Sequence, residues 1–176
     1  TEIYTLSLHD ALPIYLSNPT YSDGTSIPQV QSSTWSSLTS GAYCTYNGQL
    51  LYNWYAVHDI KGLCPAGWHI PNNSEWNVLI TFLGGTNVAG GKLKEAGTTH
   101  WNTPNTGADN SSGFTAIGAG WRGQDGTFLE LMNQGCYWSS TGTLDGLYLL
   151  LQYNSAGALI NNMNKEAGLS VRCIRD

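Results

Sequence analysis

The sequence is poor in charged residues. Only 11% of its 176 residues are Asp, Glu, Lys or Arg, against roughly a quarter in an average soluble domain. The net charge of -5 comes from twelve acidic and seven basic residues, which form no run of one sign. A basic patch or stripe is the electrostatic signature of binding to nucleic acid or to an anionic membrane. Neither is therefore expected as a partner.

Long apolar runs and catalytic motifs are also missing. No stretch of about 18 apolar residues occurs, so the sequence predicts no membrane-spanning helix. Neither H-E-x-x-H nor G-x-S-x-G occurs, and His9, His58 and His100 stand alone. His69 lies before a predicted helix, where Glu75 is better used as a cap than as a metal ligand. No metal, cofactor or catalytic residue is expected, and the chain is predicted not to be an enzyme.

Four cysteines are present, and they lie too far apart to form a C-x-x-C pair. This spacing argues against zinc and thioredoxin-type chemistry and predicts two disulfides in an oxidising compartment. We favour the pairs Cys64 with Cys173 and Cys44 with Cys136, although three connectivities stay open. A bridge from Cys64 to Cys173 would close a long loop, which typically contributes about 2 to 4 kcal/mol.

The firmest local prediction is a helix after Pro71. Asn72 can cap its first turn, while Glu75, three residues later, can reach back to complete a capping box. Apolar residues then recur on one face at helical spacing: Trp76, Leu79, Ile80 and Leu83. Gly84-Gly85 supplies the C-cap. A second helix is expected over residues 88–96, where two glycines weaken it.

Strands and loops are expected elsewhere. Residues 50–57 predict a buried strand or a helical turn, between which periodicity does not decide. Three apolar runs, 147–153, 158–163 and 169–174, predict a terminal antiparallel sheet. Residues 97–146 form a long Gly-rich loop region, which is expected to be pinned by its aromatic side chains: Trp101, Phe114, Trp121, Phe128 and Trp138.

Seven short motifs carry a resemblance to a known family. They are YSDGT (21–25), GAYC (41–44), YNWYAV (52–57), CPAGWHIPNNSEW (64–76), SGF (112–114), WSST (138–141) and SVRC (170–173). Together they closely resemble the Fibrobacter succinogenes major paralogous domain, a family of secreted and surface proteins of Bacteroidetes and related bacteria. The resemblance covers residue 17 to the end and implies a bacterial extracellular or cell-surface location.

The resemblance also implies a fold. That fold is α+β, similar to C-type lectin-like domains and to the formylglycine-generating enzyme. It has two helices, a small twisted antiparallel sheet and a long Gly-rich loop region. We therefore expect one C-type lectin-like domain over residues 17–176 with two disulfides. The family has no established activity.

Residues 1–16 depart from the family pattern, in which a strand pair and a Trp-Met segment usually stand here. They alternate apolar and polar groups as a strand does, yet residues 6–14 resemble a translated sequencing adapter. The segment is interpreted either as an exchanged strand or as an artefact of sequence assembly.

The leading hypothesis is a non-catalytic secreted or cell-surface module that acts through protein or glycan contacts. It includes self-association, because low charge removes a guard against association and an N-terminal strand could add to a neighbouring copy. Repeated head to tail, this contact would give an extracellular filament. The apolar residues that would carry it are Ile3, Tyr4, Leu6, Leu8, Leu12 and Ile14.

An alternative hypothesis is a calcium-independent, carbohydrate-binding adhesin domain. Trp101 and Trp121 lie in polar, Gly-rich sequence, where an exposed indole can stack on a sugar. Either could instead fill the core, and this interpretation is favoured for Trp121. Hydrogen-bonding groups stand near them in the sequence: Asn102, Asn105, Arg122 and Asp125. A formylglycine-generating-like oxidoreductase is disfavoured, because that enzyme needs a closely placed reactive cysteine pair.

Overall fold

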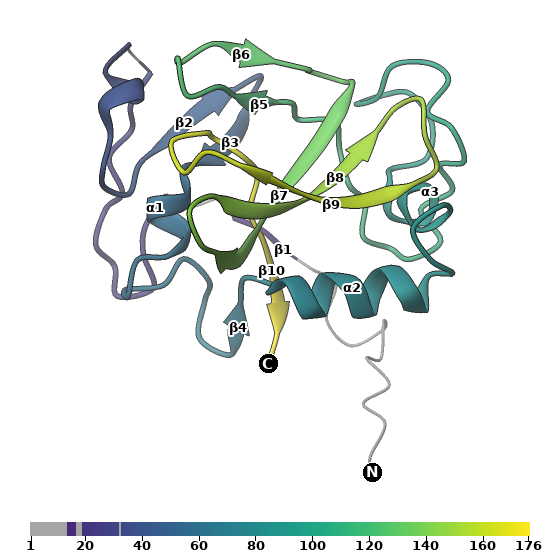
Figure 1. The fold of residues 1–176 in the computed structure, drawn as a ribbon, viewed down its shortest axis with the longest axis horizontal. Coiled ribbons are helices and arrows are strands. Elements are labelled where there is room, and N and C mark those ends of the chain that lie inside the picture. Colours follow the sequence, from purple (N-terminus) through teal and green to yellow (C-terminus); the bar gives the residue numbers. More distant parts are fainter. Residues whose placement is uncertain (1–13, 17–18, 32) are drawn as a thin grey trace.

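The computed structural model describes residues 14–16, 19–31 and 33–176 (Figure 1). This part of the chain forms an α+β domain of short helices and small antiparallel sheets. The predicted α+β class is confirmed. The segment 1–13 lies outside the described residues.

The largest sheet contains β7 (Gln134–Gly142), β8 (Gly146–Gln152) and β9 (Ala158–Met163), in that order and antiparallel. The strand β8 lies in the middle, where Leu149 and Leu151 are fully buried. On the neighbouring strand β7, Tyr137 and Trp138 are also fully buried. This sheet therefore forms much of the core.

The helix α2 (Asn73–Phe82) has the predicted capping box. The Glu75 amide donates to Oδ1 of Asn72 at 3.1 Å, and the Asn72 amide donates to Oε2 of Glu75 at 2.8 Å. Trp76 and Ile80 are buried on its inner face, and the helix runs along one side of the β7–β8 pair (Figure 1). The capping box fixes the start of the helix, and the buried face fixes its orientation.

Residues 50–57 contain both predicted alternatives. The strands β2 (Tyr43–Tyr46) and β3 (Gln49–Tyr52) form a hairpin, whose turn residues Asn47 and Gly48 have φ angles of 47° and 78°. Positive φ at both positions is the requirement of a type I′ turn. Asn53 then caps the short helix α1 (Trp54–Val57), accepting from the Ala56 amide. The chain thus changes from strand to helix at Asn53.

The helix α3 (Ala89–Leu93) is shorter than the predicted 88–96. A Cβ on Gly90 would lie 1.9 Å from the carbonyl oxygen of Gly157, and one on Gly91 would lie 2.3 Å from that of Gly107. The two glycines that weaken this helix therefore allow other segments to approach it. Lys94 takes an extended conformation and ends the helix.

A second sheet has the order β1 (Ile14–Tyr15), β10 (Arg172–Arg175) and β4 (Trp68–His69). The prediction that residues 169–174 form a strand of the sheet with β8 and β9 is therefore wrong for residues 172–174, whereas Ser170 makes an isolated parallel bridge to Tyr137 of β7. The third strand of the sheet with β8 and β9 is β7, which pairs with β8. After Ser170 the chain continues into β10, which lies between β1 and β4.

The predicted loop region 97–146 is partly strand. It contains β7 and the two-residue strands β5 (Trp121–Arg122) and β6 (Phe128–Leu129), which pair with each other. A 3₁₀ helix, η1 (Ser33–Ser37), lies earlier in the chain and buries Trp35. The expectation of anchoring aromatics holds, because Trp101, Phe114 and Trp138 are buried.

Candidate functional site

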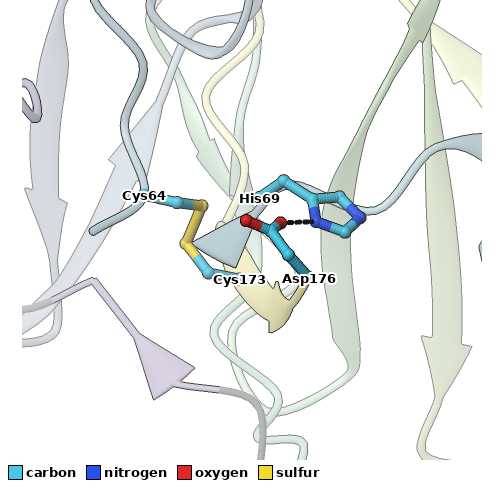
Figure 2. The surroundings of a disulfide bond; sticks show 4 residues. All are labelled: Cys64, His69, Cys173 and Asp176. Carbon is cyan, nitrogen blue, oxygen red and sulfur yellow. Dashed lines mark hydrogen bonds and ion pairs between the residues drawn. A yellow bond between two sulfur atoms is a disulfide. The ribbon is translucent and has the colours of Figure 1, made fainter. Parts of the chain in front are cut away.

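One disulfide joins Cys64 to Cys173 in β10, with a Cα–Cα distance of 5.8 Å across 109 residues of sequence (Figure 2). This confirms one predicted pair. The bridge fastens the loop before β4 to the middle strand of its sheet.

The second predicted disulfide is wrong. Cys44 and Cys136 are free thiols, and both are buried. Cys44 on β2 packs in a cluster with Trp35 and Leu51, whereas Cys136 on β7 belongs to a different core cluster. Burial raises the pKa of the Cys44 thiol to about 11 and holds the pKa of Cys136 well above its usual range. Both thiols are therefore protonated and shielded at neutral pH.

His69 lies beside the disulfide, between two carboxylates. Its Nδ1 is 2.6 Å from Oδ1 of Asp176, and its Nε2 is 2.9 Å from Oε1 of Glu75 (Figure 2 draws the first pair). A carboxylate accepts hydrogen bonds only, so this geometry favours the doubly protonated imidazolium. Burial lowers the pKa of His69, but the hydrogen bonds to Asp176 and Glu75 outweigh it, and the pKa is raised.

An open groove of about 510 Å³ runs past these groups. We call it the disulfide groove, and it is lined by residues 60–70 together with Ser22, Val57 and Ser140. Cys64 and His69 both contribute to its wall. Ile60 is fully exposed at the groove.

The wall of the groove is tied to a neighbouring loop. The Ser22 amide donates to the Gly62 carbonyl at 2.8 Å, and its hydroxyl donates to the Lys61 carbonyl. The Lys61 ammonium lies 5.0 Å from the ring centre of Tyr21. These contacts and the disulfide hold both sides of the groove in place. In the described part of the chain, no cluster of three or more His, Cys, Asp or Glu side chains is arranged to hold a metal ion.

The aromatic platform expected from the sequence is not present at Trp101. Its indole is fully buried, and Nε1 donates to the Ala116 carbonyl at 2.8 Å. Trp121 is half-buried and packs against the core. Trp101 therefore fills the core, which is the alternative that the sequence left open.

Two of the expected polar ligands are also internal. The Arg122 guanidinium lies 4.4 Å from the ring centre of Trp35 and donates to the Gln31 carbonyl at 3.0 Å. The Asn105 side chain is buried and donates to the carbonyls of Glu95 and Gly97. Both side chains bind the protein's own main chain.

The remaining two expected ligands are exposed. The side-chain Nδ2 of Asn102 donates to Oδ1 of Asn133 at 2.8 Å. Oδ1 of Asp125 accepts from the hydroxyl and the amide of Thr127, and these hydrogen bonds lower the pKa of Asp125. Asn102 and Asp125 remain accessible to a ligand.

The proposed self-association residues can be placed only in part. Ile3, Tyr4, Leu6, Leu8 and Leu12 lie outside the described residues. The main chain of Ile14 pairs with Cys173 in β1.

Tyr15 is a contact residue that sequence reasoning missed. Its hydroxyl lies 2.9 Å from the hydroxyl of Tyr137 and accepts from the Ile117 amide at 3.1 Å. These partners are 122 and 102 residues away. No local pattern could identify Tyr15, because its contacts are all distant in sequence.

The fold and the groove together define a small α+β domain clamped by one disulfide. The family model described as the Fibrobacter succinogenes major domain matches residues 16–175, so the chain belongs to this family. No curated protein and no solved structure matches the chain. Across the described residues, no helix is long and apolar enough to cross a membrane.

Proposed function

We propose that this domain is a non-catalytic module of a secreted or cell-surface bacterial protein, and that it acts by contact with a protein or a glycan. The disulfide groove carries this proposal. It is an open surface held by a covalent bridge, with the apolar side chain of Ile60 fully exposed. A concave surface that is already held in place binds a partner with a smaller loss of conformational entropy. A disulfide is also typical of proteins that fold in an oxidising compartment.

The proposed architecture is the C-type lectin-like fold that is shared with the formylglycine-generating enzyme. Three features support it: few helices, small antiparallel sheets, and a Gly-rich region pinned by buried aromatics. The enzyme's chemistry is disfavoured, because catalysis by a thiol requires an accessible thiolate. The two free thiols are buried with raised pKa values.

Self-association into a filament and calcium-independent glycan binding are two forms of the same proposal. The position of β1 supports the first: it pairs with β10 within the chain at the edge of that sheet, where the same segment of a neighbouring copy would pair in a filament. The disulfide groove supports the second, and the exposed side chains of Asn102 and Asp125, which do not line the groove, offer additional hydrogen-bonding groups.

The binding test uses a glycan array, run with and without calcium. The unmodified chain is compared with Ile60→Asp, and Leu144→Asp is the matched control because Leu144 is similarly exposed, at 92% against 101%, and does not line the groove. We expect Ile60→Asp to lower the binding signal at least tenfold, while Leu144→Asp leaves it unchanged. Equal loss in both variants would argue against the groove.

Alkylation of the native chain tests the non-catalytic part of the proposal. We expect Cys44 and Cys136 to resist modification until denaturant is added, as read by intact mass. Rapid modification of either native thiol, or turnover that is lost when one is replaced, would contradict the proposal.

A further inference from the structure

One wall of the disulfide groove is the outer edge of a strand. Among the described residues, β4 is an end strand of its sheet, and both of its residues, Trp68 and His69, line the groove. The loop that leads into β4 also lines the groove, and it lies on the side of β4 away from β10 (Figure 1). An end strand presents main-chain donors and acceptors that no neighbouring strand uses. The groove is therefore bordered by a strand edge.

The main chain of β4 faces β10 and the groove side in turn. The Asp176 amide, just after β10, donates to the Gly67 carbonyl at 3.0 Å, so residue 67 faces β10. Successive residues of an antiparallel strand direct their main-chain groups to opposite sides. Trp68 therefore faces away from β10, and its amide donates to the Pro65 carbonyl at 3.0 Å. Residue 70, two positions after Trp68, faces the same way.

Two main-chain groups on this edge have no protein partner. In the described part of the chain, neither the Trp68 carbonyl nor the Ile70 amide is hydrogen-bonded to another protein group. Ile70 is buried, and nearly all buried main-chain groups of folded proteins are paired. One residue of an extended peptide can donate to the Trp68 carbonyl and accept from the Ile70 amide, as in a parallel strand pair. The edge thus offers the hydrogen bonds of an added strand.

Two of the polar side chains that line the groove are already engaged. The Ser22 hydroxyl donates to the Lys61 carbonyl. Both ring nitrogens of His69 are held by carboxylates of the same chain. A ligand that brings its own main-chain donors and acceptors fits the open edge better than one that needs free side chains, because its groups complement those of the strand. This chemistry favours a polypeptide over a sugar.

We propose that the disulfide groove binds an extended polypeptide segment of another protein, which adds as a strand to the free edge of β4. Side chains of a strand alternate between its two faces, so every second side chain of the segment faces the groove. Three apolar residues line the groove, Val57, Ile60 and Leu63. The segment is therefore expected to carry apolar side chains at alternate positions. The inference rests on the proposed function as a contact module and names its partner.

A phage-displayed library of random 12-residue peptides, panned on the unmodified chain with its disulfide intact, supplies the probes. Selected peptides are labelled with fluorescein and titrated into the unmodified chain, Ile60→Asp and Leu144→Asp, with anisotropy as the readout. We expect Ile60→Asp to weaken binding at least tenfold and Leu144→Asp to leave it unchanged, since Leu144 does not line the groove. A library that yields no binding peptide, or equal affinity for both variants, overturns the proposal.

Methylation of single main-chain nitrogens in a selected peptide tests strand addition. An N-methyl group removes the donor of one residue and leaves its side chain unchanged. We expect at least a fivefold loss of affinity at the residue that donates to the Trp68 carbonyl, and little change at the residues on either side of it, because main-chain groups alternate along a strand. A peptide whose affinity is lowered equally at adjacent residues, or at none, overturns the proposal.

Hydrogen exchange of the main-chain amides locates the bound peptide. In the ¹⁵N-labelled chain, we expect the Ile70 amide to exchange at least tenfold more slowly when a selected peptide is saturating. The Gly120 amide is the control, because it already donates to the Gln134 carbonyl at 2.8 Å and does not line the groove. An Ile70 amide whose exchange the peptide does not slow overturns the proposal.

Two other occupants give different results. A second copy in the groove would make the mass measured by light scattering rise with concentration in the unmodified chain but not in Ile60→Asp, and this overturns the assignment to another protein. A glycan in the groove would give an array signal that Ile60→Asp lowers, while no peptide is selected. In that case the proposed function stands and this inference fails.

Discussion

Oδ1 of Asp176 lies 2.6 Å from Nδ1 of His69, although 107 residues separate them in the sequence. The Asp176 amide also donates to the Gly67 carbonyl at 3.0 Å. On the other side of the imidazole, Glu75 belongs to the first turn of α2. His69 thus joins the end of β10 to the start of α2 through charge.

This arrangement predicts a dependence of stability on pH. The carboxylates that face His69 are Glu75 from α2 and Asp176 after β10, and they raise its pKa above the ordinary value of about 6.5. The stabilisation is therefore fully present below the unfolded-state pKa and is lost as the pH rises through the folded-state pKa.

Urea unfolding of the unmodified chain and of His69→Gln, from pH 5.5 to 9, measures this effect. We expect His69→Gln to lower the free energy of unfolding by about 0.5 to 1 kcal/mol at the acidic end, since the site is partly exposed. The difference should shrink as the pH rises. A difference that grows with pH would contradict the assignment.

The bridge between Cys64 and Cys173 should determine how strongly a reductant destabilises the domain. Replacing both residues by Ala is expected to lower the free energy of unfolding by about 2 to 4 kcal/mol, because the unfolded chain is no longer constrained. Guanidinium titration of oxidised and reduced samples measures this. Cys44→Ala is the matched control, and it should keep its sensitivity to reductant.

Gly90→Ala should destabilise the protein, although a Gly-to-Ala change within a helix ordinarily stabilises it. In an open helix this change stabilises by about 1 kcal/mol. Here the added Cβ would lie 1.9 Å from the Gly157 carbonyl oxygen, so α3 must shift away from that segment. We expect a loss of about 2 kcal/mol or more, as for other overpacked sites. Thermal unfolding provides the measurement, and a raised Tm would show that the close approach is wrong.

Lys94 is a buried cation that the sequence did not identify as special. Its ammonium donates to the carbonyls of Thr106, Gln152 and Ser155, at 2.8 to 3.0 Å. Lys94→Met keeps the apolar stem but leaves three carbonyls without a donor, which should cost about 3 kcal/mol or more. Lys92→Met is the control, because Lys92 is only half-buried. Equal destabilisation by both changes would contradict the role of the ammonium.

The features that the sequence predicted correctly are those encoded by neighbouring residues. The start of α2 follows from Asn72 and Glu75, three positions apart, and its buried face follows from helical spacing. The bridge between Cys64 and Cys173 joins residues that are distant in sequence, and it was nevertheless predicted because both cysteines lie in recognisable motifs.

The features that the sequence did not predict depend on distant segments. Residues 172–175 join β1 and β4 instead of β8, because the path of the chain after β9 is set by packing. Cys44 and Cys136 lie in separate clusters, which cysteine spacing does not encode. The sequence around Trp101 predicts a loop, yet the indole of Trp101 fills the core.

The placement of β10 beside β1 has a mechanical consequence. Ile14 lies opposite Cys173, so the two ends of the described chain are side by side (Figure 1). A pulling force applied at these ends would peel β1 from β10 one residue pair at a time, at low resistance. The load would then reach the covalent bond between residues 64 and 173. Residues 16–63 lie outside the bridge and would be drawn out first, whereas residues 65–172 are enclosed by it, so extension would stop when the load reaches the intact bond.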